Sequence, residues 1–84
     1  TTPLQSLALY NNEFMLRQAR YLAERIERSA GPKPEQQVEL AFRLVFNRLP
    51  NPEEMKISKS VVARDGLFVL CRSLINSNEF FYFD

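Results

Sequence analysis

The sequence predicts an all-α fold, a compact bundle of four to five short helices with an aromatic C-terminal tail packed on the core. Three observations favour this class. Apolar residues recur at spacings of three and four along most of the chain. Asn, Pro and Gly residues interrupt that pattern where helices are expected to begin and end. No alternating segment bounded by hairpin turns predicts a strand. The 84 residues suit a single helical domain over residues 1–84.

Two helices are predicted in the first third of the chain. In the opening segment, Thr2 is a suitable N-cap and Pro3 a suitable first helical residue. The second helix is expected from residue 13 to about residue 29, ended by Gly31 and Pro32. Its apolar stripe consists of Met15, Ala19, Leu22 and Ile26, widened by Phe14 and Ala23.

The third helix is expected to begin near Pro34 and to be central in the bundle, because it is apolar on much of its circumference. Its main stripe consists of Val38, Ala41, Phe42, Val45 and Leu49. The stretch NRLPNPEE ends it and starts the next helix. Asn51 is the predicted N-cap, Pro52 the first helical residue, and Glu54 the third residue of a capping box, with Glu53 adding first-turn charge.

The fourth segment, EEMKISKSVVARDG, has weak helix propensity, because it contains serines and β-branched residues. It predicts a short helix and a break before Gly66. The last helix is expected from about residue 65 to about residue 75, with an apolar face formed by Leu67, Leu70, Cys71, Leu74 and Ile75. An Asn-Ser-Asn-Glu run is then expected to stop the helix, so that Phe80 through Phe83 fold back over the bundle.

Composition argues against most catalytic chemistry. Histidine is absent, which removes the commonest general base and metal ligand, and two glycines allow no phosphate loop. We therefore expect no enzyme activity, no cofactor and no metal site. Cys71 is the only cysteine and its apolar surroundings predict a buried thiol. A net charge of +1 (11 minus 10) argues against nucleic-acid binding, and no apolar run is long enough to span a membrane.

The charged face of the second helix and the aromatic tail are the candidate partner-binding surfaces. Glu24 and Glu27 interleave with the arginines of that helix, so the face is either a solvated, salt-bridged surface or a contact with an acidic partner. The expected partners are neighbouring domains of a parent chain or a second copy of this one. The candidate residues are Arg17, Arg20, Arg28, Phe81 and Phe83.

Three stretches carry a family resemblance: residues 1–26, residues 41–54 with the Asn-Arg-x-Pro-x-Pro-Glu-Glu turn, and residues 70–84 with Leu-x-Asn-Ser-Asn-Glu-Phe. In this order they resemble the C-terminal segment of the bacterial family called domain of unknown function 1553, prominent in planctomycetes. Beside the family, the stretch between Glu54 and Arg64 looks shorter than the usual helix and loop, which implies either a deletion in this member or a flexible loop missing from the sequence. The chain begins with Thr1, which predicts a processed product or a piece of a longer protein.

The resemblance implies a C-terminal module of a large, exported, extracytoplasmic multidomain protein, often one with a cytochrome c-like domain. It implies no reaction and no catalytic residue, and this chain has no Cys-x-x-Cys-His haem motif. The preferred hypothesis is a non-catalytic structural or interaction module. The alternatives are a small helix-turn-helix-like nucleic-acid-binding module, or an accessory domain of an extracytoplasmic enzyme.

Overall fold

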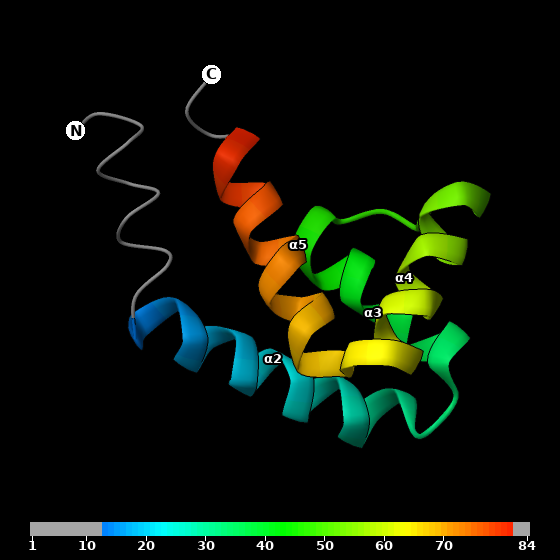
Figure 1. Ribbon diagram of the computed structural model, residues 1–84, viewed down its shortest axis with the longest axis horizontal. Helices are drawn as coiled ribbons and strands as arrows, with labels where there is room; N and C mark the ends of the chain where they lie inside the picture. The colour runs from blue at the N-terminus through cyan, green and yellow to red at the C-terminus, as the bar shows by residue number, and fades with distance from the viewer. Residues whose placement is uncertain (1–12, 82–84) are drawn as a thin grey trace.

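The computed structural model describes the backbone of residues 13–81 and the side chains of residues 13–77. This part of the chain forms four helices and no strand, so the predicted all-α class is confirmed (Figure 1). The helices are α2 (Glu13–Ala30), α3 (Pro34–Phe46), α4 (Pro52–Asp65) and α5 (Leu67–Phe81). The helix predicted in the opening segment lies outside the described residues.

The two central helices are α3 and α5, because each of them contacts every other described helix. Helices α2 and α4 lie on the outside, and within the described residues they do not contact each other. In Figure 1, α2 runs along one edge of the molecule with the other described helices on one side of it. One hydrophobic core between the helices contains Ala19, Ala23, Ile26, Val38, Ala41, Phe42, Leu67, Leu70, Cys71 and Leu74.

The buried residues of α2 are Met15, Ala19, Ala23 and Ile26, all of which the sequence places toward the core. Leu22, predicted as part of the main stripe, is only partly buried. Phe14 was expected to widen this stripe, but its side chain is 52% exposed. The reason is geometric: adjacent helical residues diverge by about 100°, so the burial of Met15 turns Phe14 away from the core. After the helix, Gly31 takes a positive φ of 79°, and its carbonyl accepts a 2.7 Å hydrogen bond from the buried amide of Gln37.

Helix α3 begins at Pro34 as predicted and ends earlier than the apolar pattern suggests. Asn47 adopts the left-handed conformation (φ 59°, ψ 36°), and its N–H donates to the carbonyl of Arg43. Asparagine tolerates this conformation better than most residues, so it ends the helix. Leu49, expected on the buried stripe of this helix, therefore lies beyond it and is 49% exposed.

Helix α4 is a full helix of 14 residues, longer than the short helix predicted. Burial accounts for the difference: Ser58 is buried, while Met55, Val61 and Val62 pack partly against the core. Tertiary packing outweighs the modest propensity cost of serines and β-branched residues. The predicted break at Gly66 is confirmed, since this residue has a φ of 101° that side-chain-bearing residues rarely adopt.

Helix α5 continues to Phe81, so the expectation that Asn-Ser-Asn-Glu stops it near residue 75 is wrong. Serine and asparagine have weak helix propensity but do not break a helix. The Ser73 and Ser77 hydroxyls donate 3.0 Å hydrogen bonds to the carbonyls four residues earlier, which keeps both side chains within the helix. The side chains of Phe80 through Phe83 lie outside the described residues, and their packing on the core stays a prediction.

Two isoleucines give a matched test of this core. Ile26 is fully buried and Ile57 is 59% exposed, although both are helical. We expect Ile26→Ala to lower the free energy of unfolding by roughly 2–5 kcal/mol through lost burial and the cavity left behind. Ile57→Ala should change it by no more than about 0.5 kcal/mol. Urea denaturation followed by circular dichroism measures both, and equal losses would contradict the described core.

Candidate functional site

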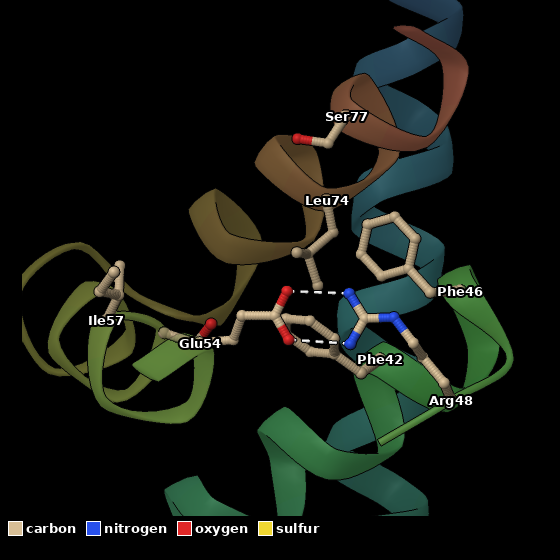
Figure 2. A pocket seen from close by; sticks show the side chains of 8 residues that line it. Phe42, Phe46, Arg48, Glu54, Ile57, Leu74 and Ser77 are labelled. Atoms are coloured by element: carbon tan, nitrogen blue, oxygen red, sulfur yellow. Dashed lines mark hydrogen bonds and ion pairs between the residues drawn. The ribbon is translucent and has the colours of Figure 1, made fainter. Parts of the chain in front are cut away.

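The most elaborate polar arrangement in the described residues joins the end of α3 to the start of α4. Arg48 Nη1 and Nη2 each lie 2.8 Å from one carboxylate oxygen of Glu54, a paired geometry that Figure 2 shows. Such a two-pronged contact is stronger and more directional than a single ion pair. Arg48 Nη1 also donates to the carbonyl of Leu49 at 3.0 Å. We call the Arg48–Glu54 pair the interhelix clamp.

The carboxylate of Glu54 also completes the capping box predicted for α4. Its Oε1 accepts the N–H of Asn51 at 2.9 Å, while the side chain of Asn51 accepts the N–H of Glu54 at 2.7 Å. Three donated hydrogen bonds therefore favour the ionised carboxylate. The Arg48 side chain and then the Asn51 N–H lower the pKa of Glu54 from 4.5 to about 2.

The Arg48 guanidinium also contacts two aromatic rings of α3. The Arg48 guanidinium carbon lies 5.5 Å from the centres of the Phe42 and Phe46 rings, and those rings are 5.4 Å apart. Phe42 is buried in the core. Cation–π attraction therefore adds to the ion pair and links the clamp to the core.

A hollow of about 600 Å³ opens beside the clamp. Figure 2 shows Leu74 and Ser77 of α5 above the Arg48–Glu54 pair, and Ile57 of α4 to one side. The walls are therefore mostly apolar with one charged edge. Its lining residues are Phe42, Phe46, Arg48, Glu54, Ile57, Ser58, Leu74 and Ser77.

Glu54 and Cys71, whose pKa values are strongly shifted, have structural roles in the described part of the chain. A carboxylate with a pKa of about 2 does not take up protons near neutral pH, and Arg48 is its partner. Cys71 is fully buried, as predicted, and burial raises the pKa of its thiol to about 12, so no thiolate nucleophile forms. Among residues 13–77, whose side chains the structure describes, Cys, Asp and Glu form no group of three that could hold a metal ion.

The predicted partner-binding arginines lie on α2 but differ in their surroundings. Arg17 is 3.9 Å from Glu13, and both side chains are more than half exposed. Arg20 lies over the ring of Phe68 in α5, with its guanidinium carbon 5.7 Å from the ring centre. Arg28 is exposed in the last turn. Arg20 thus contributes to packing between α2 and α5, whereas Arg17 and Arg28 face outward.

The other two predicted partner-binding residues are aromatic. Phe81 is the last residue of α5, and its side chain lies outside the described residues, as does all of Phe83. Their predicted role therefore stays a prediction.

The role of Arg48 was not predicted from the sequence. The residue pattern predicts the capping box of Asn51 and Glu54 but indicates no partner for the carboxylate across the turn. The available signal was the compact Arg-x-Pro-Asn-Pro-Glu-Glu stretch, in which two prolines restrict the backbone between the arginine and the cap. A reversal this tight brings residues at its two ends together.

The fold and the clamp define a small, all-α helical domain. The chain matches the family PSD1, described as a protein of unknown function (DUF1553), over residues 1–62. It therefore belongs to this family, as the sequence resemblance implied. The match includes the whole clamp and ends within α4, so the resemblance of residues 70–84 to the family's ending stays a prediction. No curated protein and no solved structure shows significant similarity to the chain.

Across residues 13–81, no helix combines the length and the apolar character needed to cross a bilayer.

The clamp predicts a specific pH dependence of stability. Because the pKa of Glu54 is lowered on folding, its contribution is complete above pH 4.5 and is lost as the pH falls towards 2. We expect Glu54→Gln to lower the melting temperature at pH 7, since glutamine keeps the cap but loses the charge. The difference from the unsubstituted chain should shrink as the pH falls through this window.

The matched control is Glu53→Gln, at the neighbouring exposed position of the same helical turn. Thermal melts from pH 7 to pH 2 compare the three proteins. A constant difference between Glu54→Gln and the unsubstituted chain across this range would show that the charge of Glu54 does not stabilise the fold.

Proposed function

We propose that this domain is a non-catalytic interaction module of a longer, exported bacterial polypeptide, and that it docks on a neighbouring domain or on a second copy. The observation that carries the proposal is the division of roles among its side chains. The groups with distinctive ionisation, Glu54 and Cys71, are used for structure. An outward face of α2 presents arginines and an aromatic residue to solvent.

The exposed face supports docking because of its composition. Tyr21 of α2 is 61% exposed, and exposed arginines precede and follow it on the same helix. Tyrosine and arginine are enriched in protein interfaces, where they combine apolar contact area with hydrogen-bonding groups. Export and an extracytoplasmic location are part of the proposal and are supported by the family resemblance alone.

Radical footprinting of the longer polypeptide tests the proposal. Tyr21 and Ile57 have similar exposure in this domain, 61% and 59%, but lie on α2 and α4 respectively. We expect oxidation of Tyr21 to be several-fold slower in the longer polypeptide than in the 84-residue chain, because docking excludes solvent. Ile57 serves as the internal reference and should be oxidised equally in both.

Measuring the molar mass of the 84-residue chain by light scattering distinguishes docking on a second copy from docking on a neighbouring domain. In that case Tyr21 should be protected only at concentrations at which dimers form. If Tyr21 is oxidised equally in both proteins and the chain is monomeric at all concentrations, the domain does not dock through α2.

A further inference from the structure

We propose that the outer face of α2 binds an acidic helical segment of its partner, an inference that rests on the function proposed above. The face consists of Arg17, Tyr21, Arg25 and Arg28, which we call the arginine stripe. At about 100° per residue, the three arginines lie within about 40° of Tyr21 around the helix axis. The stripe extends over 11 residue steps, or about 16 Å.

The stripe faces away from the core. All four of its side chains are exposed, and Tyr21 is the most exposed large hydrophobic residue of the described chain, at 61%. Ala19 and Ile26, both fully buried, lie about 140–160° from Tyr21 around the helix. Figure 1 shows the other described helices on one side of α2.

Charge is distributed unevenly around α2. The stripe itself contains no carboxylate. Glu13, Glu24 and Glu27 lie along one flank, about 60–120° from Tyr21, and Arg20 lies among them at about 100°, so this flank is net negative. The contact between Arg17 and Glu13 is long, at 3.9 Å, and both side chains are exposed, so it competes weakly with a partner. The helix therefore presents a positive central line beside a negative flank.

This pattern is complementary to a second helix more than to a nucleic acid. Arginine forms paired hydrogen bonds with carboxylates, and carboxylates one or two turns apart on a helix match the spacing of Arg17, Arg25 and Arg28. A duplex carries a phosphate charge about every 1.7 Å, so part of it would face the glutamate flank and be repelled. A partner helix with acidic residues facing the stripe and basic residues facing the flank avoids that repulsion.

Binding of defined probes to the 84-residue chain tests the inference. The probes are a fluorescent helical peptide of about 20 residues, with Glu on one face and Ala elsewhere, the same peptide with Lys replacing Glu, and a labelled DNA duplex of similar length. We expect saturable binding of the Glu peptide at low salt, which weakens as salt rises, and none of the Lys peptide. Fluorescence anisotropy provides the measurement, and circular dichroism verifies that each variant is folded.

Two triple variants that lose equal positive charge distinguish binding through the arginine stripe from non-specific attraction of the Glu peptide to a positively charged protein. Arg17→Gln, Arg25→Gln and Arg28→Gln together remove the stripe. Lys33→Gln, Lys56→Gln and Arg72→Gln together remove three exposed charges elsewhere. We expect the first set to weaken binding of the Glu peptide by about tenfold or more and the second by less than about threefold, since contacts at short range outweigh net charge.

Three results would overturn the inference: equal weakening by both sets, no binding of the Glu peptide at low salt, or tighter binding of the duplex than of the peptide. The last would identify nucleic acid as the partner. If Tyr21 is protected in the longer polypeptide while the 84-residue chain binds no acidic peptide, the docking function stands and only the chemistry assigned to the partner is wrong.

Discussion

The path of the chain between α3 and α4 depends on one charged pair. Arg48, just beyond α3, holds the carboxylate of Glu54 in the first turn of α4 at 2.8 Å through two hydrogen bonds, while the same carboxylate accepts the N–H of the N-cap residue. Helix α4 contacts only α3 and α5 among the described helices. The clamp joins the turn after α3 to the first turn of α4, and packing on α3 and α5 positions the rest of the helix.

The clamp also connects the surface of the domain to its core. The Arg48 guanidinium lies against Phe42, which is buried between the central helices. Because the rings of Phe42 and Phe46 already restrict the Arg48 side chain, its ion pair with Glu54 costs little further conformational entropy. The clamp thus uses its charges within the domain to stabilise the turn, whereas the outer face of α2 combines exposed arginines with an exposed aromatic side chain.

Much of the fold could be predicted from the sequence, because local signals and burial agree at most boundaries. The stripe of α2, the start of α3 at Pro34, the capping box at Asn51 and the break at Gly66 were all readable from residue type and spacing. The extension of α5 was missed because hydroxyl groups that bond to the preceding turn are indistinguishable, in sequence, from those that end a helix.

The candidate site was less predictable than the fold. Apolar periodicity describes one helix at a time, whereas Arg48 and Glu54 meet across the turn between two helices. Arginine and glutamate are also common at exposed positions, so residue type alone does not distinguish this pair. Leu49 was misplaced for a related reason: an apolar residue in phase with a stripe was assigned to it, although the left-handed Asn47 had already ended the helix. In both cases the backbone geometry of the turn decides, and residue type alone does not encode it.

A double-mutant cycle on the interhelix clamp measures whether the charged pair holds the turn between α3 and α4. Arg48→Met keeps an apolar side chain near the rings and Glu54→Gln keeps the cap, so the cycle isolates the charged pair. The double variant should be scarcely less stable than the less stable of the two single variants, whereas the same cycle on the exposed Glu13–Arg17 pair, with its 3.9 Å separation, should give additive losses. Additive losses at Arg48 and Glu54 would show that the turn is held by other contacts.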